Sequence, residues 1–387
     1  MESTVDLKDL KTAYRNKSNQ ELRYTYYIFK ILQYPKLTGF LTACANAIIK
    51  YNLPLKFKIK KKVFKIFCAG ETVEEAFKII KQLEKHKVKA VLDYVSEGEK
   101  NDLTFMANAD IITANSLILG ETSTGNHISV KLSSLEDTEF FRQINGNTFP
   151  ENKRFETFLN RLDMICKTAF QQKVIVYIDA EDRCMQDIFD KTTAYMMEKY
   201  NKEVAIVFKT LQMYLKDRLD YLDLLIREGK EKKYIPAIKL VRGAYLNKER
   251  ESAIRKKRES PIYGTKNQTG LAFNKAMEIC LSNFKAADTC IASHNDETTL
   301  LAINYIEKHK ITNHSSKVTF SQLYGMSDHI TVNLAAKGYN TVKYLPYSEV
   351  KKALPYLIMR SEENSSINGQ MSSEIIRLKL EMERSCL

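Results

Sequence analysis

The sequence predicts an α/β protein, a (β/α)8 barrel of the TIM type with an N-terminal helical extension. From residue 88 onward, eight short β-branched runs alternate with charged amphipathic stretches of helical length. Such alternation is typical of parallel βαβ units, and eight of them are the number that closes into a barrel. An open doubly wound sheet is the alternative. It is disfavoured because no G-x-G-x-x-G motif follows the first run and no P-loop occurs in the chain.

The helical extension is predicted over residues 1–87. Residues 24–32 and 39–49 carry apolar side chains at helical spacing. The clearest helix lies within residues 70–87, where Thr72 is suited to cap the first turn. Glu74 and Glu75 follow in that turn, as expected near the positive end of a helix.

The eight predicted strands are short and rich in β-branched residues, which favours strands over pieces of buried helix. They are residues 88–95, 127–134, 173–181, 203–209, 236–245, 289–295, 317–325 and 340–347. Helices are predicted between and after them, among others over residues 155–171, 185–200, 212–228, 298–309 and 349–363. The domains predicted from this order are the extension over 1–87, the barrel over 88–378 and a C-terminal tail over 379–387.

The chain is basic, with 60 lysines and arginines against 47 acids and a formal charge of +13. Nucleic acid, anionic lipid or another polyanion would be attracted, but a soluble, lysine-rich surface is the simplest interpretation. The densest cluster, residues 56–65, interleaves lysines with apolar residues. It suits either an anionic membrane face or a solvated segment with one buried side.

Cysteine usage and hydropathy bear on the compartment. The seven cysteines form no CxxC pair, which predicts reduced thiols in a cytoplasmic protein. The first ten residues are acidic and polar, unlike a signal peptide. The apolar stretch at residues 40–49 is too short to span a bilayer, so any contact with the inner membrane is expected to be peripheral.

The candidate site is the C-terminal end of the predicted strands, where chemistry sits in barrels of this kind. The predicted mouth has few acids and several cations, namely Lys131, Lys239, His294, Lys343 and Arg360. Tyrosines at 245, 324, 344 and 347 add flat apolar faces. This mixture predicts a planar cofactor with phosphates and a small carboxylate substrate. Gly243 is expected to let the backbone approach a ligand closely.

Purely structural roles remain open for these residues. Lys131 and Asp179 are suited to form an ion pair inside the barrel, and His294 to a hydrogen-bonded place at its rim. Lys239 and Arg242 face opposite sides of one strand, so only one of them needs to point inward. No pair of histidines has the spacing of a metal motif such as HExxH, so no metal site is predicted.

Several motifs together resemble the proline dehydrogenases, a family of flavin enzymes with a (β/α)8 barrel. They are SVKLSSL (129–135), YIDAE (177–181), LQMYLKD (211–217), KLVRGAY (239–245), SHN (293–295), FSQLYGM (320–326) and YLPY…PYLIMRSEEN (344–364). They occur in the family's order, and the resemblance runs from about residue 20 to 378. Any one of them alone would be a weak signal.

The resemblance implies roles for individual residues. Lys131 and Arg360 are expected to bind the carboxylate of proline, with Asp179 close by and Tyr344 packed against the proline ring. The expected contacts to FAD are Gln212, Lys239, Gly243, Ala244, Tyr245, Lys266, Ser293, His294, Asn295, Gln322 and Glu363. Lys239 stands where many relatives have an arginine near the flavin N5 atom. Lysine keeps the positive charge but lacks the planar, forked set of donors of a guanidinium group.

The implied activity is the FAD-dependent oxidation of L-proline to 1-pyrroline-5-carboxylate, with electrons passed to a quinone. This is the first step of proline degradation to glutamate. Met359 stands where the family has a second arginine that clamps the substrate carboxylate. The first alternative is therefore a relative with weakened proline activity, or a relative that acts on hydroxyproline or another cyclic amine. The second alternative is a barrel without flavin that binds anionic ligands or nucleic acid through its charge. Nucleic acid is not expected as a partner.

Overall fold

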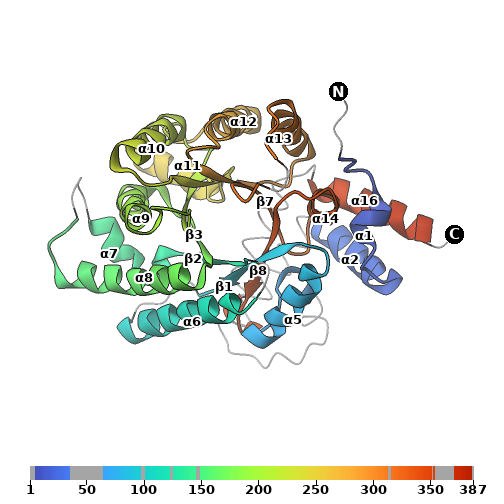
Figure 1. Ribbon diagram of the computed structural model, residues 1–387, viewed down its shortest axis with the longest axis horizontal. Coiled ribbons are helices and arrows are strands. Elements are labelled where there is room, and N and C mark those ends of the chain that lie inside the picture. The colour runs from blue at the N-terminus through green and yellow to red at the C-terminus, as the bar shows by residue number, and fades with distance from the viewer. Residues whose placement is uncertain are drawn as a thin grey trace.

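The computed structural model describes residues 5–34, 64–96, 101–122, 125–144, 149–312, 315–350, 352–353 and 370–385. Eight strands form a closed barrel in the order of the chain, and each pairs in parallel with its neighbours (Figure 1). The last strand, β8 (Thr341–Tyr347), closes the ring by pairing along the whole of β1 (Lys89–Tyr94). The predicted fold class is confirmed.

The remaining strands overlap the predicted ranges. They are β2 (His127–Val130), β3 (Ile175–Ile178), β4 (Val207–Gln212), β5 (Ala237–Val241), β6 (Asp288–Ala292) and β7 (Val318–Leu323). The prediction for β4 was wrong at both ends, since residues 203–206 precede the strand. There the side-chain oxygen of Asn201 accepts hydrogen bonds from the backbone of Ile206 and Val207, which folds the segment into a turn.

Helices surround the barrel. Those that follow the strands are α6 (Asp102–Gly120), α7 (Thr138–Gln143), α8 (Lys153–Gln172), α9 (Gln186–Tyr200), α10 (Arg218–Lys232), α11 (Leu246–Arg255), α12 (Lys266–Ser282), α13 (Asp296–Lys308) and α14 (Asp328–Ala336). Because β4 runs to Gln212, α10 begins later than predicted. The predicted helix over 39–49 and most of that over 349–363 lie outside the described residues.

Side chains alternate along each strand between the barrel interior and the helices, as the pleat requires. The interior is a packed core that includes Val91, Tyr177, Phe208, Cys290 and Val342. The outward residues join a larger core with the helices. The barrel interior is therefore filled by side chains, and barrels of this kind carry their chemistry at the C-terminal ends of the strands.

Three further helices lie beside the barrel (Figure 1). They are α1 (Leu10–Tyr14), α2 (Asn19–Leu32) and the C-terminal α16 (Gln370–Ser385), and they share a small apolar core. Lys17, between α1 and α2, forms an ion pair with Asp328 of α14 at 2.5 Å, which ties this group to the barrel. The predicted boundary at 378/379 falls inside α16. The domain limits themselves stay a prediction.

Two other helices have features that bear on the predictions. Helix α5 (Val73–Glu84) begins as expected, because the hydroxyl of Thr72 accepts a hydrogen bond from the backbone of Glu75. Helix α6 is the one described helix long and apolar enough, by length and composition alone, to cross a membrane. It packs along α8 and against β1 and β2, and core helices of other proteins share its composition.

Candidate active site

The mouth of the barrel gathers polar side chains from five strands. Asp93 comes from β1, Lys239 from β5 and Tyr344 from β8, while Lys131 and Asp179 directly follow β2 and β3. Each stands two positions from an inward residue of its own strand, so the pleat turns it toward the axis. Asp179 and Tyr344 were predicted for the substrate, and the structure brings them into contact.

Asp179, Lys239 and Tyr344 form a closed triangle. The ammonium of Lys239 lies 2.6 Å from the Asp179 carboxylate and 3.0 Å from the Tyr344 hydroxyl, which accepts a hydrogen bond from it. That hydroxyl in turn donates to Asp179 at 2.9 Å. The ammonium also lies 4.2 Å from the centre of the Tyr344 ring. One carboxylate thus neutralises the lysine and orients the phenol.

Protonation in this triangle follows from burial. Burial, together with the charges of Asp179 and Asp93, raises the pKa of Tyr344 well above its usual value. The phenol therefore stays protonated at neutral pH and remains a donor to Asp179. Its ring is buried, so it forms a fixed wall of the mouth.

Asp93 is a site residue that the sequence interpretation missed. It is buried, and the hydroxyl of Ser129 donates a hydrogen bond to it at 2.5 Å. Burial raises its pKa, Lys131 opposes that shift and Asp179 adds to it. The expectation of a mouth with few acids was therefore wrong. The available signal was an acid at an inward position of an otherwise apolar strand.

Lys343 was predicted to face the mouth, and this was wrong. It precedes the inward Tyr344 on β8 and so points outward, toward α14. Its ammonium lies 2.8 Å from Asp328 and its side chain is only 2% exposed. The positive charge of Lys343 is used to hold α14, and through Asp328 also Lys17, against the barrel.

The predicted cofactor contacts surround the ends of β4 to β7. The amide of Gln212 donates to the carbonyl of Glu181 at 2.8 Å and accepts from the backbone of Ala244 at 3.2 Å, linking the loops after β3 and β5. Ala244 is exposed, and Tyr245 is half-buried where α11 begins. Lys266 is the first residue of α12, which Thr265 caps.

Gly243 is needed for the fold itself, and its close approach to a ligand stays a prediction. Its φ of +128° lies in the region that favours glycine. A Cβ placed there would lie 2.4 Å from the ring of Tyr214. The glycine thus makes room for a neighbouring side chain, while its own outer face stays exposed.

The predicted contacts on β6 and β7 are partly used by the fold. Asn295 caps α13, since its side chain accepts from the backbone of Thr298 at 2.7 Å. The amide of Gln322 donates to the carbonyl of Ser293 at 3.2 Å and accepts from Thr331 at 2.8 Å. Both side chains therefore support the loop that carries Ser293 and His294.

Three predicted positions of the C-terminal motif lie outside the described residues, as does most of the basic cluster at 56–65. They are Met359, Arg360 and Glu363. In the described part of the chain, no group of three or more His, Cys, Asp or Glu side chains is placed to hold a metal ion.

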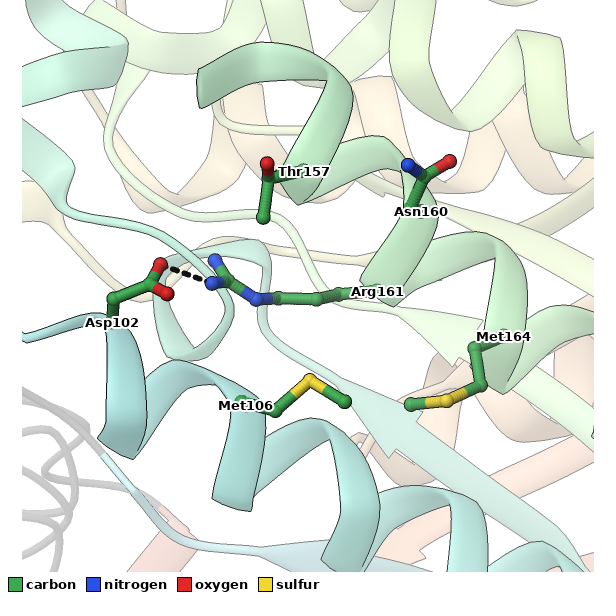
Figure 2. A pocket seen from close by; sticks show the side chains of 6 residues that line it. All are labelled: Asp102, Met106, Thr157, Asn160, Arg161 and Met164. Carbon is green, nitrogen blue, oxygen red and sulfur yellow. Dashed lines mark hydrogen bonds and ion pairs between the residues drawn. The ribbon is translucent and has the colours of Figure 1, made fainter. Parts of the chain in front are cut away.

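A surface pocket lies between α6 and α8 (Figure 2). It is lined by Asp102, Met106, Thr157, Asn160, Arg161 and Met164. Arg161 pairs with Asp102 and donates to the carbonyl of Leu135 at 3.0 Å, so it ties the two helices to the loop after β2. None of these residues belongs to the mouth, and we assign the pocket no chemistry.

The residues present fit a planar cofactor with phosphates. The rim offers a buried cation at Lys239, an exposed lysine at the start of α12 and small exposed residues at Gly243 and Ala244. A flat ring needs such an open edge, and phosphates need cations and backbone donors.

A parallel eight-stranded barrel with paired acids and bases in its C-terminal mouth defines an enzyme of the (β/α)8 class. The family model described as proline dehydrogenase matches residues 76–373. The chain belongs to the proline dehydrogenase family, and the family expected from the motifs is confirmed. It is thus an oxidoreductase of that family.

Known relatives agree with this assignment. Proline dehydrogenase 1, mitochondrial, of Dictyostelium discoideum is 28% identical over 97% of this chain and 74% of its own length. Hydroxyproline dehydrogenase of Xenopus laevis is 27% identical over 96% of this chain and 88% of its own. The solved proline utilization A (PutA) of Bdellovibrio bacteriovorus, inactivated by N-propargylglycine, matches 82% of this chain with a TM-score of 0.71. At 21% identity that match concerns the fold, and this chain spans 35% of that one.

Proposed function

We propose that this protein is an FAD-dependent proline dehydrogenase that oxidises L-proline to 1-pyrroline-5-carboxylate and passes the electrons to a quinone. The observation that carries the proposal is the triangle of Asp179, Lys239 and Tyr344 in the mouth of a barrel of this family. It combines a fixed cation, a fixed carboxylate and an aromatic wall, which suit a small cyclic amino acid beside a flat ring.

The protein's own part in this reaction is to bind and orient the substrate. Lys131, near Asp93, is the second cation of the described mouth and would hold the substrate carboxylate. Arg360, outside the described residues, is the other predicted clamp. The ring of Tyr344 would limit where the substrate ring can lie, and orientation of this kind is a large part of catalysis.

The cofactor would supply the acceptor for the hydride that leaves the carbon next to the substrate nitrogen. Lys239 is the residue best placed to present positive charge to it, because Asp179 and Tyr344 fix its ammonium. Gln212, Ala244, His294 and Lys266 would hold the remaining parts of the cofactor. Asn295 and Gln322 would act mainly by supporting Ser293 and His294.

Hydroxyproline or another cyclic amine is the second candidate substrate. The relative named hydroxyproline dehydrogenase matches nearly the whole of this chain. In addition, Met359 takes the place of a clamp arginine of the family. Loss of a charged hydrogen bond costs about 1.5–3 kcal/mol, or roughly 10- to 150-fold in affinity for the substrate.

The electron acceptor and the cellular location of the protein are part of this proposal. We propose a cytoplasmic protein that meets its quinone at the surface of the inner membrane. The net charge of +13 and the basic cluster at 56–65 support attraction to anionic lipid.

The test is the absorbance spectrum of the purified protein, followed by L-proline and then by hydroxyproline with a quinone analogue present. The proposal expects a yellow protein that proline bleaches. Lys239→Met should lose most of the turnover, whereas Lys230→Met on the exposed face of α10 should match the wild type. A colourless protein that takes up no added FAD would sink the proposal, and bleaching by hydroxyproline alone would favour the second candidate.

A further inference from the structure

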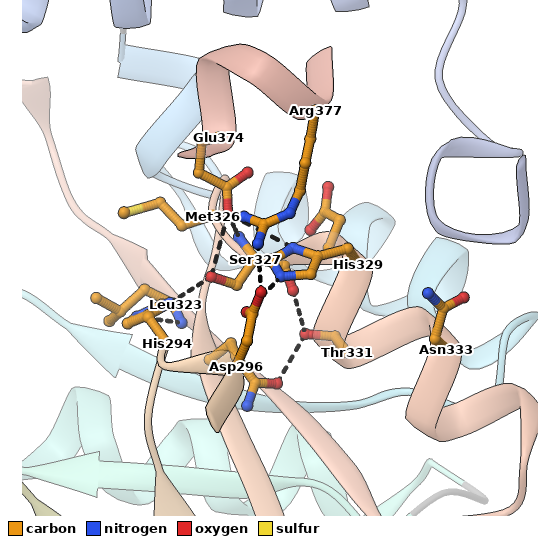
Figure 3. Close-up of polar contacts among 12 residues, drawn as sticks. His294, Asp296, Leu323, Met326, Ser327, His329, Thr331, Asn333, Glu374 and Arg377 are labelled. Atoms are coloured by element: carbon orange, nitrogen blue, oxygen red, sulfur yellow. Dashed lines mark hydrogen bonds and ion pairs between the residues drawn. The ribbon is translucent and has the colours of Figure 1, made fainter. Parts of the chain in front are cut away.

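A chain of hydrogen bonds, buried except at its half-buried histidine, connects the C-terminal helix α16 with the mouth of the barrel (Figure 3). We call it the α16 relay and define it as His294, Ser327 and Glu374. His294 follows β6, Ser327 directly precedes α14, and Glu374 lies in the second turn of α16. The sequence separates His294 from Glu374 by most of three βα units, so only the fold brings them together.

The bonds of the relay define one arrangement of protons. The backbone of Leu323 donates to Nε2 of His294 at 3.5 Å, so that nitrogen accepts. Nδ1 then carries the proton and donates to Oγ of Ser327 at 2.9 Å. The Ser327 hydroxyl is left to donate to the carboxylate of Glu374 at 3.3 Å. A carboxylate at the end of such a chain selects the tautomer of the imidazole.

The carboxylate of Glu374 is held firmly. Its side chain is 6% exposed, and it accepts a second hydrogen bond from the backbone of Ser327 at 3.0 Å. Nδ1 of His329 lies 3.6 Å from it and Arg377 lies 3.8 Å from it. Arg377 and His329 both contact Asp296 as well. The guanidinium of Arg377 and the ring of His329 thus lie beside the Glu374 carboxylate without taking the bonds to Ser327.

The relay does more than dock the helix. The ion pair of Arg377 with Asp296 already anchors α16 to the start of α13. Ser327, in contrast, has a φ of +52°, which costs a residue other than glycine about 1 kcal/mol or more. In this conformation both its N–H and its hydroxyl donate to Glu374. A docking contact alone would not require it.

We propose that Glu374 is a positioning residue for the cofactor site, fixing the orientation and the Nδ1–H tautomer of His294 through Ser327. The inference rests on the proposed function to the extent that His294 contacts the flavin. A helix outside the barrel thereby sets the hydrogen-bonding state of a residue at its mouth.

The test compares variants that break the relay with variants that keep it. Glu374→Ala removes the carboxylate, and Ser327→Gly removes the hydroxyl while it keeps the backbone bond and tolerates the positive φ. Glu374→Gln retains an acceptor of the same shape and serves as the rescue. Glu383→Ala, on the exposed side of α16, is the matched control.

The first readout is the 15N NMR signal of His294 in flavin-free protein, assigned by its absence in His294→Gln. Glu374→Ala and Ser327→Gly should move it away from the Nδ1–H form, and Glu374→Gln and Glu383→Ala should not. The second readout is the dissociation constant for FAD, which the two breaking variants should raise about threefold to tenfold. Their folding is checked by circular dichroism.

An unchanged tautomer in Ser327→Gly, which leaves α16 anchored, overturns the inference. So does an unchanged affinity for FAD in both breaking variants. A wild-type protein that binds no FAD defeats the proposed function instead, and the NMR comparison still decides whether Glu374 controls His294.

Discussion

The ion pair of Asp179 and Lys239 allows a quantitative test of how the mouth is built. The perturbation is a double-mutant cycle with Asp179→Asn, Lys239→Met and the two combined. The side chain of Lys239 is 6% exposed and that of Asp179 is 16% exposed, so neither charge is well solvated. Removing one member leaves the other charge buried and unpaired, which is the costly outcome.

The magnitude follows from the partners that remain. Breaking a buried pair costs about 3–5 kcal/mol. Asp93 also interacts with Lys239, and Tyr344 still accepts from it, so Asp179→Asn should fall near 3 kcal/mol, the lower end. In the double variant neither charge is stranded. We therefore expect the double variant to cost about 2 kcal/mol less than the sum of the two single variants, and this difference is the coupling energy of the pair.

The assay is urea unfolding of all four proteins at pH 7, followed by circular dichroism. The control is the same cycle on Lys216 and Glu259, an exposed pair at 2.5 Å, for which the coupling should be within error of zero. A coupling energy near zero for Asp179 and Lys239 would refute the reasoning, because the two charges would then not depend on one another.

Three further changes have defined outcomes. Gly243→Ala should destabilise the protein by about 1–3 kcal/mol and lower its flavin content, because the new Cβ meets the ring of Tyr214. Urea unfolding measures the loss of stability, and the flavin absorbance measures the flavin content. Asn152→Ala should cost about 1 kcal/mol in urea unfolding, since the cap of the backbone of Phe155 at 2.7 Å is lost; no change would mean that water replaces it. Burial raises the pKa of Asp288 to about 6, so the folded protein binds its proton more tightly than the unfolded chain. The contribution of Asp288 to stability should therefore fall by about 3 kcal/mol as the pH rises from about 4 to 6. The difference in stability between the wild type and Asp288→Asn should change by that amount over this range, and a constant difference contradicts the assignment.

Local sequence was enough to predict most elements around the barrel. The helix of residues 73–84 starts where Thr72 predicts it, because a cap depends on residues three apart in the chain. The start of β4 was missed because the bonds of Asn201 to Ile206 and Val207 are side-chain contacts that no periodicity reports. The period of two assigns Lys343 to the outside once Tyr344 is known to point inward, but both had been expected at the mouth.

The roles of site residues were less accessible. Asp179 and Tyr344 were expected in the mouth from the family's motifs, but their shared contact with Lys239 was not. Asp93 has no motif of its own, and its importance depends on the neighbours that bury it. The clamp around Arg360 stays a prediction, since it lies outside the described residues.

The sequence by itself determined the class of fold and the family, because periodicity, capping and the order of motifs are properties that the chain shows without its tertiary structure. The tertiary structure alone decided which charges neutralise one another. Asp179 is 60 residues from Lys239 and 165 from Tyr344, and their contacts depend on how the eight strands close into a ring. The link of α16 to His294 has the same origin, since ion pairs and hydrogen bonds act over a few ångströms and only a folded chain sets distances of that size.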